Sequence, residues 1–215
     1  YTLAMEHVLA GDNMGDEVKG QWYVQKDPCE GCALAAQAHF DNQQLTPADI
    51  WRKARIALEA RQIKATRQAV DIVAPQASVA LTDLMGKPEQ FLAKLSPSGS
   101  RQSQEMAVLA LIRLADSSPD TAANLLQSRW GKHLDAQQRA WAWGAIGKQA
   151  ALKLSDRALS YFQNASPKAM HDDHLAWRAR AALRQHQWQD ALDAINAMSE
   201  DAASDTTWTY WRARA

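Results

Sequence analysis

Two cysteines are the first side chains along the sequence whose types and spacing could do chemistry. Cys29 and Cys32 stand in the segment DPCEGC, and a C-x-x-C spacing occurs in redox sites and as half of a zinc site. A zinc site would need further ligands and the sequence has no second cysteine pair. A thioredoxin-like site would need a βαβ unit, which the pattern does not indicate. We expect a local disulfide or two thiols beside a helix start.

The segment HDDH, His171 to His174, is the most metal-like cluster. Histidines three residues apart share a helix face, but a zinc site usually takes a third or fourth protein ligand. Aspartates just before an apolar periodic run are also favourable at a helix N-terminus. The sequence therefore predicts a helix start here, and no metal ligand is assigned.

Tryptophan is abundant, with nine residues, and indole rings can stack on sugars. Trp177, Trp188 and Trp211 fall on apolar stripes at helical spacing, where packing is the expected role. Trp141 and Trp143, in RAWAWGAIG, are two residues apart. Since two such residues cannot both face one core, we expect one of this pair to be partly exposed and available for a surface contact.

No pattern of a catalytic or cofactor site stands out. The sequence has no Gly-rich phosphate loop, no G-x-S-x-G and no H-E-x-x-H. Basic and acidic residues balance at 24 each, which argues against a nucleic-acid binder. No apolar run approaches the length of a membrane span. We therefore predict no catalytic residue, no cofactor, no nucleic-acid partner and no transmembrane segment, and the chain reads as a scaffold or interaction surface.

The elements that must position any site are predicted to be helices. The chain has 215 residues, 47% of them hydrophobic, with only nine Gly and seven Pro. Few β-branched residues and no alternating runs argue against strands. In the last fifty residues, a helix over 171–185 is followed by the turn HQW, a helix over 188–198, a capping segment SEDAASD and a further helix from 206.

A repeat indicates how these helices are arranged. The string WRARA occurs at 177–181 and again at 211–215, which is an offset of 34 residues. That period is typical of helical-hairpin solenoids of tetratricopeptide type, in which stacking buries the apolar face that one hairpin leaves exposed. A similar pattern spans 46–75, with Thr46 as N-cap and Pro47 at the first helical position, and Leu58 aligns with Leu183. The predicted fold class is all-α, a superhelical array of antiparallel helical hairpins.

The domain organisation is predicted to be simple. No long Gly, Ser or Pro linker interrupts residues 1–215, so we expect one α-superhelical domain. The chain begins at Tyr1 inside an amphipathic stretch and ends at Ala215 without a Gly or Pro stop. Both ends look cut, and we expect a fragment of a longer protein.

Particular residues also resemble a known family, over the chain from about Trp22 to Ala215. The C-terminal pattern W-x-x-R-x-A-L, a turn, a helix and W-x-Y-W-x-A-R resembles the superhelical, U-shaped domain of the soluble lytic murein transglycosylase family. The positions that carry the pattern are Trp177, Arg180, Ala182, Leu183, Trp208, Tyr210, Trp211, Ala213 and Arg214. The spacing of Cys32 and Pro47 is similar to that family as well.

This resemblance implies a periplasmic enzyme of Gram-negative bacteria. Such enzymes cleave the β-1,4 bond between N-acetylmuramic acid and N-acetylglucosamine in peptidoglycan and leave a 1,6-anhydro product. The family's single catalytic Glu lies in a Glu-Ser context within a lysozyme-like domain, ahead of Gly-Leu-Met-Gln. Neither motif is in this sequence, so the catalytic domain is expected C-terminal to this chain and the segment alone is expected to be inactive.

The resemblance also implies partners and a place. The expected partners are peptidoglycan glycan strands and the parent's own catalytic domain, in the periplasm, with the parent either soluble or anchored to the outer membrane through its N-terminus. Trp141, Trp143, Arg178 and Arg180 are the candidate glycan or domain contacts, with the two arginines on a different helix face from Trp177. Cys32 could pair with Cys29 or with a cysteine outside the segment.

A second function class stays open on the sequence. A tetratricopeptide-like scaffold that grips a partner protein, with no enzymatic parent, would show the same repeat. The tetratricopeptide signature is incomplete here, because its Leu-Gly and Tyr are missing at the expected places.

Overall fold

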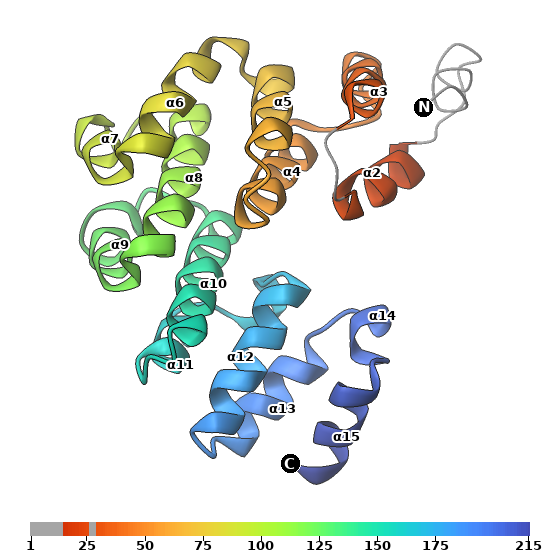
Figure 1. The fold of residues 1–215 in the computed structure, drawn as a ribbon, viewed down its shortest axis with the longest axis vertical. Helices are drawn as coiled ribbons and strands as arrows, with labels where there is room; N and C mark the ends of the chain where they lie inside the picture. Colours follow the sequence, from red (N-terminus) through yellow and green to blue (C-terminus); the bar gives the residue numbers. More distant parts are fainter. Residues whose placement is uncertain (1–14, 26–28) are drawn as a thin grey trace. The chain divides into compact units, whose positions relative to one another are not determined.

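A computed structural model of the chain describes residues 15–25 and 29–215, and its ribbon is drawn in Figure 1. It divides into two compact units, one ending at Lys87 and one spanning Pro88–Ala215. Residues 15–25 and 29–215 contain helices, turns and loops but no β-strand. The predicted amphipathic stretch at 1–10 lies outside the described residues. That 1–215 forms a single domain stays a prediction.

Unit 1 consists of antiparallel helical hairpins. Its elements are α2 (Gly15–Val24), α3 (Glu30–Asp41), α4 (Pro47–Glu59), α5 (Ile63–Val73), the 3-10 turn η1 (Pro75–Ala77) and α6 (Ser78–Gly86). The predicted start of α4 is confirmed: Thr46 is the N-cap, Pro47 is the first helical residue, and Thr46 and Asp49 cap each other's backbone N–H groups.

Unit 2 continues the same hairpin pattern. Its elements are α7 (Pro88–Lys94), α8 (Arg101–Ser117), α9 (Pro119–Leu125), the π-helical turn η2 (Leu126–Trp130), α10 (Ala136–Leu152), α11 (Ala158–Phe162), the 3-10 turn η3 (Pro167–Ala169), α12 (Asp172–Arg184), α13 (Trp188–Asn196), α14 (Glu200–Ala203) and α15 (Thr206–Arg214). The helices predicted over 171–185, 188–198 and from 206 are confirmed by α12, α13 and α15. SEDAASD holds the short helix α14, where we expected only capping residues.

Several of the hairpins share one type of turn. Within the described parts of the chain, the non-glycine residues with positive φ all follow helix ends, namely Gln43, Arg61, Leu154 and His186. After α12, the N–H of Gln187 donates to the Ala182 carbonyl at 2.9 Å, and after α4 the N–H of Gln62 donates to the Ala57 carbonyl at 2.8 Å. These bonds are the six-residue closure of a Schellman turn. They place the two chain reversals in the register predicted by aligning Leu58 with Leu183.

Alanine and glycine allow the helices of unit 2 to approach closely. α10 contacts α8 and α9 as well as α11 and α12, so it is covered on several sides. A Cβ on Gly147 would lie 2.8 Å from the Phe162 ring, and one on Gly144 would lie 2.3 Å from Nδ1 of His174. The absence of a side chain at these two positions is therefore what lets α11 and α12 pack on α10.

Candidate functional site

Trp141 and Trp143 are both buried, at 4% and 6% exposed. The expectation that one of them is partly exposed was wrong, because it assumed a single core facing α10. α10 is instead packed between helices on different sides. The ring of Trp143 stacks on Tyr161 with centroids 6.2 Å apart, while Trp141 lies against the segment that begins α12. Neither indole has an open face for a sugar ring.

The HDDH segment begins α12, as predicted. His171 is the N-cap residue, and its side chain accepts the N–H of Asp173. Asp172 accepts the N–H and the hydroxyl of Ser199 at 2.9 and 2.8 Å, which joins α12 to the start of α14. The rings of His171 and His174 lie 5.3 and 5.5 Å from that of Trp141. Within the described residues, no group of three His, Cys, Asp or Glu could hold a metal ion.

Arg178 belongs to the packing of unit 2. It is 5% exposed, and its guanidinium donates to the carbonyls of Phe162 and Ala165, both at 3.2 Å. A second nitrogen is paired with Asp190 at 3.0 Å. The cation therefore caps the C-terminal end of α11 and links it to α13, where it satisfies carbonyls that a helix end leaves unpaired. It is not placed to contact a glycan.

Arg180 is exposed and is oriented by two indoles. Its Cζ lies 5.0 Å from the ring centroid of Trp177 and 4.9 Å from that of Trp208, within range of cation–π attraction. The prediction that the arginines of WRARA lie on a different face from Trp177 was wrong for Arg180, because residues three apart are neighbours on a helix. Trp188 was also predicted to be packed in the core, and this was wrong, because its side chain is 41% exposed.

A groove of about 230 Å³ lies beside Arg180 in unit 2. It runs between the α10–α11 turn and α12. Its lining residues are Ala151, Leu154, Ser155, Ala158, Trp177, Arg180, Ala181, Arg184 and Gln185. Three alanines, Leu154 and Trp177 form its apolar part, and the polar residues are two arginines, one glutamine and one serine, whose side chains carry hydrogen-bond donors. This groove is the candidate site, since it combines a hollow with convergent polar groups.

Arg184 also lines the groove and was missed from the sequence. It donates to the Leu154 carbonyl at 2.6 Å and to the Asp156 carboxylate at 3.2 Å. The available signal was its spacing, because Arg180 and Arg184 are four residues apart and lie on the same helix face. That the α10–α11 turn covers this face could not be read from α12 alone.

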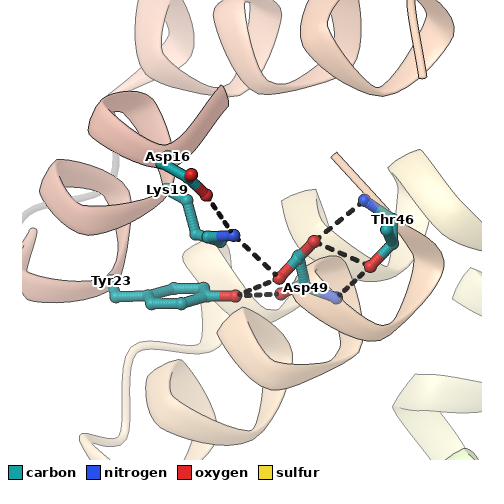
Figure 2. A network of polar contacts seen from close by, with 5 residues as sticks. All are labelled: Asp16, Lys19, Tyr23, Thr46 and Asp49. Carbon is teal, nitrogen blue, oxygen red and sulfur yellow. Dashed lines mark hydrogen bonds and ion pairs between the residues drawn. The ribbon is translucent and has the colours of Figure 1, made fainter. Parts of the chain in front are cut away.

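A polar network in unit 1 joins α2 to the start of α4, as Figure 2 shows. The Tyr23 hydroxyl donates to Asp49 Oδ1 at 3.1 Å, Lys19 is paired with the same carboxylate at 3.7 Å, and Thr46 donates to Asp49 Oδ2. Burial raises the pKa of Asp49, but hydrogen bonds from Thr46 and Tyr23 outweigh this and hold that pKa below its usual value. Burial, with the Asp49 charge, raises the pKa of Tyr23. The network consists of the N-terminal cap of α4 together with two side chains of α2 that bind the capping carboxylate, so its role is structural.

The two cysteines stand at the start of α3. Both are free thiols in this structure, and Cys29 is the N-cap residue whose sulfur accepts the N–H of Cys32 at 3.1 Å. Hydrogen bonding from Cys32 lowers the pKa of the Cys29 thiol, while burial raises that of Cys32. The expected helix start is confirmed, and a disulfide between the two stays a prediction.

Comparison with solved structures gives a likeness that covers almost the whole chain. No protein-family model matches the chain, and no curated protein matches it. A solved structure of an inactive mutant of the lytic transglycosylase Slt from Pseudomonas aeruginosa is similar over 99% of this chain, with a TM-score of 0.62 and 21% sequence identity. The chain spans 36% of that protein's length. The likeness shows a lytic transglycosylase-like helical fold and confirms the all-α superhelical class.

Proposed function

We propose that this chain is a non-catalytic scaffold segment of a periplasmic lytic transglycosylase of a Gram-negative bacterium. The parent would cleave the β-1,4 bond between N-acetylmuramic acid and N-acetylglucosamine in peptidoglycan and release 1,6-anhydromuropeptides. The observation that carries the proposal is the likeness in fold to the lytic transglycosylase Slt over 99% of this chain. The residues of WRARA and W-x-Y-W-x-A-R add sequence support at the C-terminal end.

The side-chain contacts of unit 2 support the proposed scaffold role. In unit 2, the buried Arg178 binds two backbone carbonyls and His171 caps the start of α12, which are structural contacts. Among the described residues, no group of three His, Cys, Asp or Glu could hold a metal ion. In the proposed role, the hairpins support the parent's catalytic domain and contact peptidoglycan strands. Among the four residues predicted to make such contacts, Arg180 is the exposed one. None of the described helices is both long and apolar enough to cross a membrane, and anchoring of the parent to the outer membrane belongs to the proposal.

The gene beyond the codon for Ala215 provides the first test. We expect a lysozyme-like domain with Glu-Ser and a later Gly-Leu-Met-Gln. The full-length protein should release 1,6-anhydromuropeptides from purified sacculi, and the 215-residue chain should release none. A full-length protein without that domain, or one that leaves sacculi intact, would contradict the proposal.

A second candidate is a tetratricopeptide-like module that binds a partner protein and has no enzymatic parent. The hairpin repeat and its Schellman turns favour it equally. Further helical hairpins downstream of Ala215, in place of a catalytic domain, would support this alternative.

A further inference from the structure

The groove between the α10–α11 turn and α12 offers donors to a negatively charged ligand. Among the residues that the structure describes, the guanidinium of Arg180 lies over the rings of Trp177 and Trp208. Its charge also acts on the Asp205 carboxylate, which is exposed and which a ligand carboxylate would have to outcompete. The two indoles hold this side chain in place, so less rotamer freedom is lost when it binds a ligand. Arg180 is thus an oriented cation that lines the groove and could pair with an anionic group of a ligand.

Arg184 supplies the second cation. Its bond to the Leu154 carbonyl at 2.6 Å fixes the guanidinium against the α10–α11 turn. Its other partner is Asp156, at 3.2 Å, whose side chain is 92% exposed. Such an exposed ion pair contributes little, so a ligand carboxylate that is partly desolvated in the groove can replace it. Arginine is suited to this, because its planar fork matches a carboxylate.

The remaining lining limits the size and character of the ligand. The apolar part consists of Ala151, Ala158 and Ala181 together with the side chains of Leu154 and Trp177. A volume of about 230 Å³ is below the range of about 300–1,000 Å³ for pockets that hold drug-sized ligands. The groove therefore fits one small apolar side chain together with a carboxylate. The Ser155 hydroxyl and the Gln185 amide can bond the peptide group that precedes such a residue.

We infer that this groove binds the free carboxylate end of a short alanine-containing peptide. The carboxylate would lie between Arg180 and Arg184, and the methyl group would pack against Ala151, Ala158 and Ala181. The inference rests on the proposed function for its source, which is the peptide stem of peptidoglycan, since stems contain alanine and end in carboxylates. It adds to that function a peptide-recognition site in the helical segment, separate from any cleavage of glycan.

The test is a titration of the 215-residue chain followed by NMR. Acetyl-D-alanyl-D-alanine is compared with its C-terminal carboxamide, which has the same shape and no charge. We expect the free acid to bind about tenfold more tightly, as the loss of one charge-assisted hydrogen bond to an arginine predicts. The shifted signals should lie in α12 and the α10–α11 turn. Equal binding of the two peptides, or no binding of the acid, would overturn the inference.

Variants locate the site. Arg180→Gln and Arg184→Gln should each weaken binding of the free acid about tenfold and leave the carboxamide unaffected. Lys168→Gln is the matched control, because it removes one positive charge from an exposed position of unit 2 outside the groove. Asp156→Asn should strengthen binding, since it frees Arg184. An equal loss in Lys168→Gln would show that net charge alone acts. The comparison of acid and carboxamide on the unsubstituted chain stays decisive if a variant fails to fold.

Acetyl-L-alanyl-L-alanine distinguishes two sources of the peptide, a peptidoglycan stem and the C-terminus of a protein. Tighter binding of the D-form supports a peptidoglycan stem, and tighter binding of the L-form assigns the groove to protein C-termini and overturns the inference. A failure here is distinguishable from a failure of the proposed function, because release of 1,6-anhydromuropeptides by the full-length protein is measured independently of this titration.

Discussion

The hairpin α4–α5 in unit 1 and the hairpin α12–α13 in unit 2 have the same core and the same turn. The aligned pairs Ala57 and Ala182, Ala69 and Ala194, and Val70 and Ile195 are all 0% exposed. Their chain reversals have φ of 60° at Arg61 and 56° at His186. The same positions of the two hairpins are therefore buried, although the polar residues that flank them differ.

The two hairpins differ in what their cations do. Lys53 and Arg178 occupy aligned positions and are both buried. The ammonium of Lys53 donates to the carbonyls of Trp22 and Gln25, at 2.5 and 3.4 Å, whereas Arg178 binds two carbonyls and the carboxylate of Asp190. At the next aligned pair, Arg55 is 3% exposed while Arg180 faces solvent. One repeat thus uses a cation for packing where the other has one available for a ligand.

The largest expected effect separates Lys53 from Arg178. Arg178→Met should lower the free energy of unfolding by about 3 kcal/mol, because two carbonyls lose a charged donor and Asp190, which keeps its bond to Gln163, loses its cation. Lys53→Met should lower it by only about 1 kcal/mol. Burial lowers the pKa of this lysine, so its removal also relieves a desolvation penalty. Urea denaturation followed by tryptophan fluorescence measures both, and equal losses would mean that the two cations are equivalent.

A second contrast concerns glycines within helices. Gly147→Ala should destabilise the chain by about 2 kcal/mol, because the added methyl would lie 2.8 Å from the Phe162 ring. Gly20→Ala in α2 is the control, since a Cβ there meets nothing within 4 Å, and it should stabilise by about 0.5–1 kcal/mol. Thermal unfolding detects both signs. A stabilising Gly147→Ala would show that α11 does not pack on α10 at this point.

The pH dependence of the free energy of unfolding should report on Asp49 in the polar network of unit 1. The pKa of Asp49 is lower in the folded chain than its ordinary value, so its contribution to stability is present above about pH 4 and is lost as the pH falls through the lowered pKa. Asp49→Asn should cost about 1 kcal/mol at neutral pH and should flatten this part of the profile. Hydrogen exchange of α4 between pH 3 and 7 would check it, with Asp205→Asn at the α15 cap of unit 2 as the comparison. An unchanged acid profile in Asp49→Asn would rule out this carboxylate as the titrating group.

The smallest expected effect tests whether the two turns are equivalent. Arg61→Gly and His186→Gly relieve a left-handed conformation that costs a non-glycine residue about 1–2 kcal/mol, offset by the entropy that glycine loses on folding. Each should therefore raise the free energy of unfolding by about 0.5 kcal/mol. Chemical denaturation of both variants in parallel measures the difference, and opposite signs would show that the turns do not share one geometry.

The sequence by itself determined the helices and their repeat. Periodicity placed α12, α13 and α15, Thr46 and Pro47 marked the start of α4, and the alignment of Leu58 with Leu183 set the register of two hairpins. These features depend on residues within a few positions of one another. Caps, turns and helix faces depend on residues close together in the sequence, so the sequence pattern predicts them directly.

Only the tertiary structure decided which side chains are available for binding. Trp141 and Trp143 are both enclosed because helices pack on several sides of α10, and Arg178 is buried because the end of α11 needs donors. The groove needs Arg184 from α12 together with Ser155 and Leu154 from the α10–α11 turn. Whether a helix face is buried or open depends on neighbours that come from distant parts of the chain, and periodicity within one helix carries no information about them.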